Sequence, residues 1–506
     1  MPKSRPESRI NKVVIVGRDE ALWLAANVIW AAFHRTGLEI VAVELPSRRR
    51  PADVIPTLSN QPAFHGLMGI DERPLMAATQ ATYSLGQRFA DFADDRPAFI
   101  QGYGPHGEAI NGVPFHHYWL RARARGLPAA YERFSLNAVA ADQGRFFMPQ
   151  AETGAFAGGG HAYHLPAIAY ARVLKQVALQ RGVAHAEGDW GFASLDPATG
   201  DIAAVSLADG RTIEGAFFID ATGADSLLLG GALETKISSW RHWFPCDRLL
   251  TTTGPALHLV PAYSQVSAFR SGWIGLYPLR DRTAIRQAYC SAELSEAQAL
   301  EAAVRVTAMR FSGETSVSAC AAGRRQAIWA GNCVGIGEAA AVFDPIGEVG
   351  VQAIMAGLAH LTALFPIDSD MVAERAEYNR NLISTFERIR DYQICFYTLN
   401  RRQGQALWTQ CRDMALPDAL AYKIDLFAAR GHLVEYDDET FVGHDWHALF
   451  LGFGLIPRAY DPAVDQVPDA EIIQRFQQRL GTIKHRVEAM GTMDAYLQPQ
   501  NVAQAQ

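Results

Sequence analysis

A run of residues near the N-terminus has the position of a phosphate-binding loop and part of its composition. Val13 to Val16 predicts a buried strand, and Gly17 follows where such loops turn. The usual pattern, Gly-x-Gly-x-x-Gly, brings backbone N–H groups and the positive end of a helix against a pyrophosphate. Here Asp19 and Leu22 stand at the second and third glycine positions. A carboxylate about 4 Å from a phosphate costs roughly 4 kcal/mol at an effective dielectric constant of about 20. Compensation by Arg18 and a loop that turns Asp19 away are the two alternatives, and in either case we expect tight binding in the usual pose to be lost.

An acidic residue ends the next strand of the same unit. Ala21 to His34 predicts a helix, and Leu38 to Glu44 predicts a second buried strand that ends on an acid. Strand, turn, helix and strand within about 30 residues form a βαβ unit, in which this acid binds a ribose hydroxyl. We therefore assign Gly17, Ala21 and Glu44 to a nucleotide site.

Two later segments each run from an apolar strand into acids and glycines. Phe217 to Asp220 precedes Ala-Thr-Gly, and Cys333 to Ile336 leads through a Pro/Gly turn to an apolar helix at Val351 to Leu364. The N-terminus of that helix would face an anionic or electron-rich ligand. A strand-end Asp that caps the next turn is the alternative for Asp220. The residues assigned to the ligand in these segments are Asp220, Gly223, Gly337, Asp344, Pro345, Gly347, Val349 and Gly350.

The elements that hold these loops predict an α/β fold. Strands and helices alternate up to about residue 365, including a strong helix at Ala167 to Gly182, and the chain from Ala373 reads mainly helical. We predict a dinucleotide-binding, Rossmann-like core with an inserted β-sheet substrate region and a C-terminal helical region. The core covers residues 10–365, with dinucleotide-binding segments 12–60, 161–230 and 330–365 and substrate-side insertions 61–160 and 231–329. The helical region covers 366–506.

Composition and charge exclude several classes of partner. The 506 residues are 49% hydrophobic and 20% charged, with a formal net charge of −7, so no basic surface for nucleic acid is expected. The basic run Arg48-Arg49-Arg50 is short and typical of a solvated loop. No stretch approaches the roughly 18 apolar residues of a membrane span, and the polar start Met1 to Pro6 is followed by no signal-peptide core. We expect a cytoplasmic protein with neither nucleic-acid nor membrane partners.

The cysteines give no sign of a structural cross-link. The chain has six, without a Cys-x-x-Cys pair. Their scattered spacing indicates a reduced compartment and neither a disulfide framework nor a zinc site, and we predict no metal.

Taken in order, these segments resemble the flavin-dependent tryptophan halogenases, a branch of the FAD monooxygenase fold. The resemblance runs from about residue 12 to 460 and includes Phe115 to Leu120, Gly272 to Leu279 and Gly443 to Trp446. It implies an FAD-type core, FAD used in its reduced form FADH2, a separate flavin reductase, and an aromatic or indole-bearing small molecule or peptide as substrate. In the family, hypohalous acid formed at the flavin travels through a tunnel to a Lys beside the indole, where a Glu assists proton removal. A homodimer is one oligomeric state that the sequence leaves open.

The resemblance also implies a substrate pocket lined by aromatic side chains. Ordinary packing is the alternative for each of them. The residues so implied are His116, His117, Trp119, Trp273 and Trp446.

The chain departs from the family pattern at the catalytic positions. Ser84 stands where the Lys belongs, and a serine hydroxyl can neither form a haloamine nor act as a cationic donor. The Glu position holds Gly347, with Glu348 one residue later, and Gly275 and Tyr277 replace a Trp and an Ile of the tunnel segment. The turn from Asp344 to Gly350 resembles instead the turn with which FAD hydroxylases and reductases offer backbone donors to the flavin.

We name Ser84 and Glu348 as the catalytic positions and predict a flavin-dependent oxidoreductase that is not a standard halogenase. Two alternatives stay open. One is a non-catalytic protein that binds a substrate or partner and has lost the flavin because Asp19 and Leu22 block the groove. The other is a true halogenase that uses Glu348 and another cation.

Overall fold

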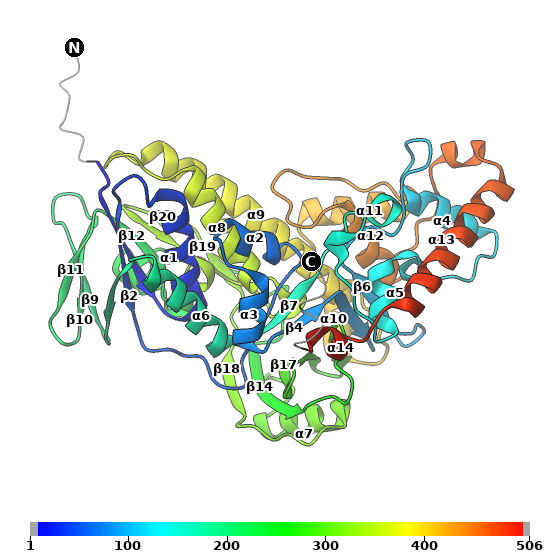
Figure 1. Cartoon of the computed structure of the whole chain (residues 1–506), viewed down its shortest axis with the longest axis horizontal. Helices are drawn as coiled ribbons and strands as arrows, with labels where there is room; N and C mark the ends of the chain where they lie inside the picture. Colours follow the sequence, from blue (N-terminus) through cyan, green and yellow to red (C-terminus); the bar gives the residue numbers. More distant parts are fainter. Residues whose placement is uncertain (1–8, 499–506) are drawn as a thin grey trace, which may run out of the picture.

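The computed structural model describes residues 9–498, so the polar start Met1 to Pro6 lies outside the described residues. A six-stranded sheet, with parallel pairing from β21 to β8 and β20 antiparallel at one edge, occupies the left of Figure 1. This is the Rossmann-like core that the sequence predicts. In spatial order its strands are β20 (Trp329–Ala330), β21 (Cys333–Gly335), β12 (Phe217–Ala221), β1 (Lys12–Gly17), β2 (Glu39–Glu44) and β8 (Ala184–Glu187).

The apolar run of β1 is explained by burial on both faces of this sheet. Val13 and Ile15 pack in the core that includes α1 (Asp19–Phe33), α6 (Ala167–Gln180) and α8 (Gly350–Ala363). Val14 and Val16, which point to the opposite face, pack against a three-stranded sheet. That sheet consists of β11 (Thr212–Glu214), β10 (Ile202–Leu207) and β9 (Trp190–Leu195).

A seven-stranded sheet forms the substrate side and draws strands from both predicted insertions. β5 pairs in parallel with β15, which joins residues near 88 to residues near 265. The strands in order are β18 (Ser316–Ala319), β14 (Arg248–Pro255), β17 (Arg282–Tyr289), β16 (Gly272–Pro278), β15 (Ser264–Phe269), β5 (Gly86–Ala90) and β6 (Phe99–Gly102).

Two small sheets connect the core to this substrate side. One is β3 (Val54–Pro56), β7 (Ala162–Pro166) and β4 (Thr82–Ser84), and the other is β13 (Ile237–Ser239), β19 (Gly323–Arg325) and β22 (Ala341–Val342). Helices fill the connections: α2 (Gln61–Leu67), α3 (Glu72–Thr79), α4 (Phe115–Ala124), α5 (Leu136–Asp142) and α7 (Glu296–Thr307).

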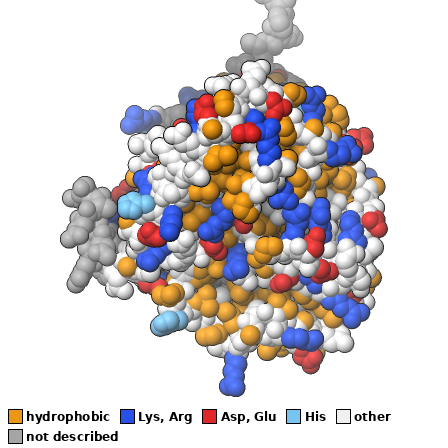
Figure 2. Space-filling view, turned by 90° about the vertical axis from the view of Figure 1, so that its right-hand side faces the viewer, with side chains coloured by type: hydrophobic (Ala, Val, Ile, Leu, Met, Phe, Trp, Pro, Cys, Tyr) orange, Lys and Arg blue, Asp and Glu red, His pale blue; other side chains and the backbone are white. Residues whose placement is uncertain are grey.

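From α8 onward the described chain is built of helices. Figure 2 shows hydrophobic side chains gathered at the centre of the molecular face that carries α4 and α13, with charged side chains around them. The helices are α9 (Val372–Thr398), α10 (Ala406–Asp413), α11 (Asp418–Arg430), α12 (Gly443–Gly452), α13 (Asp469–Ala489) and α14 (Met493–Leu497).

Two expectations from the sequence concern membrane-spanning segments and the cysteines. Residues 346–363 are apolar and long enough to span a membrane, which the sequence reading did not anticipate, but 67% of this window is buried inside the protein, as in a core helix. All six cysteines are free.

Candidate functional site

The turn between β1 and α1 is tighter than its sequence predicts. A Cβ on Gly17 would lie 2.5 Å from the carbonyl oxygen of Ala221 on β12, so only glycine fits there. The helix begins at Asp19, two residues before the predicted start, and Asp19 has a left-handed backbone at φ +56°. The first backbone N–H groups of α1 have no acceptor within the helix and open towards an anion site.

The two side chains that replace glycines are both held by other parts of the fold. Asp19 accepts hydrogen bonds from the Ser47 hydroxyl at 2.5 Å and from the backbone N–H of Arg48 at 3.2 Å. Leu22 is fully buried in the core. Leu22 therefore does not enter the groove, whereas the Asp19 carboxylate lies in the contact between α1 and the loop after β2.

Arginines surround the same turn. Arg49 forms an ion pair with Glu20 in the first turn of α1, with an Nε–Oε2 distance of 3.1 Å. Arg48 donates to Asp225 at 2.8 Å, and Arg18 lies 3.7 Å from the same carboxylate. The Arg48 side chain is 60% exposed, as expected for a solvated loop, and Arg48 and Arg49 also form ion pairs with acids beside α1.

Glu44, the predicted ribose ligand, is engaged by neighbouring side chains. It forms an ion pair with Lys175, and His185 Nε2 lies 2.8 Å from its carboxylate. Glu44, His185 and Glu187 are the described residues whose ligand atoms lie close enough together for a metal ion. The ammonium of Lys175 contacts both glutamates, at 3.6 Å from Glu187, and so supplies a cation to this group.

Asp220 is buried, and its carboxylate is used within its own turn. It accepts hydrogen bonds from the Thr222 hydroxyl at 2.6 Å and from the backbone N–H groups of Leu228 and Leu229 at 2.9 and 2.8 Å. These contacts fit the alternative of a capping residue. Gly223, next in the turn, has φ +77°.

A chain of hydrogen bonds between buried polar groups supports the turn before α8. The Trp273 indole donates to the Tyr397 hydroxyl at 2.9 Å, and Tyr397 donates to Asp344 at 3.0 Å. Burial raises the pKa of Asp344 to about 6. Pro345 and Val349 flank the short helical turn Ile346–Glu348, and Gln393 fixes it by donating to the carbonyl groups of Asp344 and Ile346.

The glycines of this turn differ in the space around them. A Cβ on Gly347, at φ +78°, would lie 3.0 Å from the ring of Phe396, and one on Gly337 would lie 3.0 Å from Ile354. A Cβ on Gly350 would meet nothing within 4 Å. The start of α8 therefore faces open space, where a flat ring could lie against its N–H groups.

Glu348 and Ser84 meet at one buried tyrosine. Tyr103, at the end of β6, donates its hydroxyl proton to Glu348 Oε2 at 3.0 Å. Ser84 is fully buried, donates to the carbonyl of Gly86 at 2.9 Å, and is a hydrogen-bond neighbour of Tyr103. The structure thus brings together the two predicted catalytic positions.

Glu348 has an unusual environment for a carboxyl. Its side chain is 3% exposed and its backbone is left-handed at φ +61°. Burial raises its pKa to about 7, against the opposing effects of Ser264, Tyr103 and Arg286. One carboxylate oxygen, Oε1, has no hydrogen-bond partner among the described residues. Such a carboxyl can take up or release a proton near neutral pH.

Gly275 and Tyr277 stand where the family resemblance expects a Trp and an Ile of the tunnel segment. A Cβ on Gly275 would lie 2.8 Å from the ring of Tyr277. The Tyr277 ring therefore fills the space that a side chain at position 275 would need, so glycine at 275 and tyrosine at 277 fit together.

The predicted substrate residues fall into separate places. Trp273 lies on β16 and bonds to Tyr397 under the turn before α8, and Trp446 packs on Tyr392 with ring centroids 4.9 Å apart. Trp119 is buried and donates to the carbonyl of Ala129 at 3.0 Å. His116 and His117 line a cavity of about 600 Å³ between α4 and α11, and none of these three tryptophans lines it.

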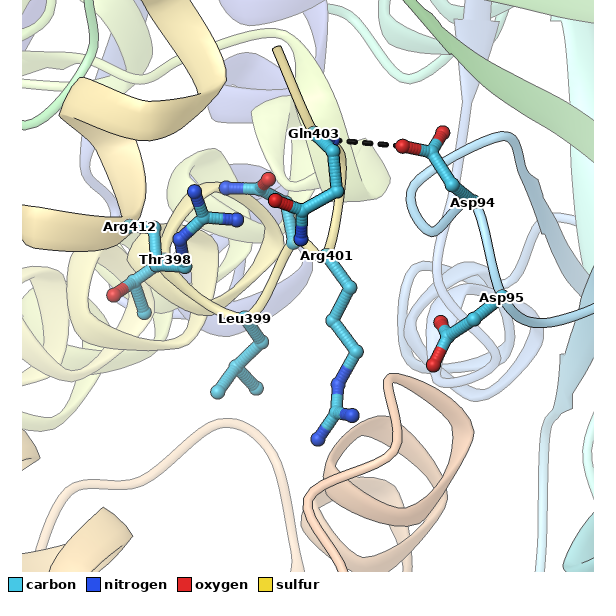
Figure 3. Close-up of a pocket in the computed structure, with 8 residues that line it drawn as sticks. Asp94, Asp95, Thr398, Leu399, Arg401, Gln403 and Arg412 are labelled. Atoms are coloured by element: carbon cyan, nitrogen blue, oxygen red, sulfur yellow. Dashed lines mark hydrogen bonds between the residues drawn. The ribbon is translucent and has the colours of Figure 1, made fainter. Parts of the chain in front are cut away.

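A second cavity, of about 640 Å³, lies where α9 ends. Figure 3 shows Asp94 and Asp95 on one side and Arg401 and Arg412 on the other. Asp94 accepts a hydrogen bond from the backbone N–H of Gln403 at 2.7 Å. These charged groups have no contact with the predicted catalytic pair.

Sequence reasoning missed Tyr103, Asp225 and the ion pairs of Arg48 and Arg49. Tyr103 follows β6 and lies between Gly102 and Gly104, and this pattern alone does not indicate a functional residue. Asp225 lies only five residues beyond Asp220, but nothing in the sequence shows that it faces the loop after β2.

Comparison with known proteins decides the family. The tryptophan halogenase family profile matches residues 12–469. The chain belongs to the tryptophan halogenase family. It is 26% identical to tryptophan 7-halogenase KtzQ of Kutzneria sp. (strain 744), over 97% of this chain and 98% of that protein.

Two solved structures show the same likeness at higher identity. BrvH, a flavin-dependent halogenase from Brevundimonas sp. BAL3, superposes with a TM-score of 0.93 at 33% identity, over 97% of this chain and 99% of that one. Xcc4156, a flavin-dependent halogenase from Xanthomonas campestris, gives 0.92 at 30%, over 97% and 98%. These matches confirm the predicted Rossmann-like FAD fold and the predicted resemblance to the tryptophan halogenase family.

Proposed function

We propose that this member of the tryptophan halogenase family is a flavin-dependent oxygenase of an aromatic, indole-bearing small molecule or peptide, and not a standard halogenase. The observation that carries the proposal is the buried Glu348–Tyr103 pair beside Ser84. It stands where the resemblance expects a Glu and a Lys, and no cation of this cluster can carry a halogen atom. Arg286, the nearby cation, is a guanidinium and not a lysine ammonium.

The residues fit FAD, with a changed phosphate end. Open space at Gly350 beside the start of α8 suits the flavin ring, and the first N–H groups of α1 suit the diphosphate. Leu22 is buried in the core, and the Asp19 carboxylate is held by the Ser47 hydroxyl and the N–H of Arg48. When bound and reduced by a separate reductase, FAD supplies the oxidising chemistry with O2.

The reaction balances as an aromatic hydroxylation. One oxygen atom of O2 replaces a ring hydrogen, the other leaves as water, and reduced FAD supplies two electrons and two protons. Glu348 is the base that accepts the proton released from the substituted ring carbon, because its carboxyl titrates near neutral pH and has one free oxygen. The Tyr103 hydroxyl holds the other carboxylate oxygen in place.

The same contacts give the buried aromatic residues a positioning role. The Trp273–Tyr397–Asp344 chain fixes the turn that carries Glu348. Tyr277 fills the space beside Gly275, and we place it between the flavin and the substrate.

A non-catalytic binding protein is the second candidate. The observation that favours it is the set of carboxylates at the phosphate end, Asp19, Glu20 and Asp225, which repel a diphosphate unless the arginines compensate.

Turnover with matched variants separates these functions. The assay supplies reduced FAD from a reductase, O2, indole or a tryptophan peptide, and bromide, and reads products by mass spectrometry. We expect an oxygenated product that Glu348→Gln lowers at least about 100-fold, as expected for loss of a general base. The control Glu132→Gln, a carboxyl whose pKa burial also raises, should retain activity. A brominated product would contradict the proposal, and substrate binding without any product would establish the binding protein.

A further inference from the structure

Two segments far apart in the sequence close over the N-terminus of α1. Arg48 comes from the loop after β2, and Asp225 ends the short helix Gly223–Asp225 after β12. Arg48 donates to Asp225 at 2.8 Å, and Arg18 Nη2 lies 3.7 Å from the same carboxylate. The groove of a dinucleotide passes between these two segments in this fold, so the ion pair lies across its path.

The arginines are better suited to a diphosphate than to their present partner. A guanidinium binds carboxylate and phosphate in the same two-pronged geometry, and a diphosphate offers more charge and more acceptors than one carboxylate. Arg18 keeps a buried Nε without a hydrogen-bond partner among the described residues. Its other amino group donates to the carbonyl of Pro46 at 3.2 Å, which holds the side chain beside the turn.

Two other acids of the turn have hydrogen-bond or ion-pair partners of their own. Arg49 compensates Glu20, and Asp19 is held by the Ser47 hydroxyl and the N–H of Arg48. Asp225 is thus the acid that competes for Arg18 and Arg48, and its side chain is 31% exposed, so it can turn outward.

We propose that Arg18 and Arg48 form the diphosphate site of this chain in place of the missing glycines, and that Asp225 is an internal competitor which a nucleoside diphosphate displaces. The ligand class is the ADP half of a dinucleotide. The inference rests on the proposed use of FAD, but it concerns the phosphate end alone.

ADP tests this site without any flavin chemistry. Isothermal titration calorimetry of the full-length protein with ADP compares wild type, Asp225→Asn, Arg48→Gln and the double variant. Asp225→Asn should bind ADP at least about tenfold more tightly, and Arg48→Gln at least about tenfold more weakly, since each changes one charge at contact distance. In the double variant the gain from Asp225→Asn should shrink, because one of the released arginines is gone.

The matched control is Asp209→Asn, which removes an Arg–Asp ion pair of the same kind, with Arg211, at the β10–β11 turn. It should leave ADP affinity unchanged, and thermal melts without ligand should show that every variant folds. Equal ADP affinity in wild type and Asp225→Asn, or in wild type and Arg48→Gln, would overturn the inference.

The outcome separates this inference from the proposed function. An ADP response as expected, with no turnover of an aromatic substrate, would overturn only the oxygenase. Turnover without an ADP response to either substitution would overturn only the arginine site.

Discussion

Glu348 combines a carboxyl that is 3% exposed with a left-handed backbone at φ +61°. Such a backbone costs a non-glycine residue roughly 1–3 kcal/mol, and it persists only where the surroundings enforce it. Gln393 and the Trp273–Tyr397–Asp344 chain provide that support. Strain and a raised pKa at one residue are typical of functional positions.

The pKa of Glu348 predicts how stability depends on pH. Its folded-state pKa of about 7 lies above the model-peptide value, so its contribution to stability is complete below about pH 4.3 and is lost as pH rises through 7. Glu348→Gln removes this loss, worth roughly 3 kcal/mol. Urea unfolding should therefore show the variant gaining free energy of unfolding, relative to wild type, between pH 4.5 and 8.

The control for this measurement is Glu314→Gln at a carboxyl that is 81% exposed. Its pH profile shows how the loss of a surface carboxyl alone affects unfolding. A constant difference for Glu348→Gln would mean that the carboxyl titrates normally.

At the scale of elements, α4 and α12 meet through buried imidazoles. The rings of His116 and His447 stack with centroids 3.8 Å apart, and His117 lies 4.0 Å from His116. Burial lowers the pKa of His116 to about 3 and that of His447 well below its usual value, and His117 shifts in the same direction. These histidines are neutral in the folded protein.

This contact predicts instability in acid. A histidine with a depressed pKa gives stability above its unfolded-state pKa of about 6.5, which is lost as pH falls, at about 1.4 kcal/mol per pH unit for each group. Replacing His116 by Gln should make the free energy of unfolding fall less steeply between pH 6.5 and 5 than in wild type. The exposed His34, replaced by Gln, serves as the control, and an unchanged slope in the His116 variant would contradict the assignment.

The two ends of the nucleotide groove predict opposite effects of a single methyl group. Gly17→Ala places a Cβ against the backbone of β12 and should destabilise the protein by roughly 1–3 kcal/mol. Gly350→Ala meets nothing within 4 Å and should leave thermal stability equal or slightly higher, but weaken flavin binding because the methyl group occupies the open space. Thermal melts and flavin titration of both variants check this pair, and normal flavin affinity in Gly350→Ala would place the ring elsewhere.

At the scale of the whole molecule, the sequence predicts the features that depend on residues close together in the chain. The buried run from Val13, the strand ending at Asp220 and the turn before Gly350 predicted the core, because burial on both faces and turn chemistry leave direct marks. The family resemblance located Ser84 and Glu348. The partners of these residues could not be predicted, since Tyr103 reaches Glu348 and Arg48 reaches Asp225 only through the fold.

The site also shows where local readings mislead. The sequence made Asp19 an obstacle to phosphate, but the turn directs its carboxylate to Ser47. Arg48 is the exposed charge that the sequence indicates, but its ion pair with Asp225 could not be predicted from the sequence.

Anaerobic titration of the purified protein with reduced FAD, followed by fluorescence and compared with oxidised FAD, tests the central claim most directly. We predict saturable binding of reduced FAD with a dissociation constant of roughly 1–100 μM, equivalent to about 5.5–8 kcal/mol. Failure of both forms to bind at hundreds of micromolar would contradict a flavin-dependent function for this chain.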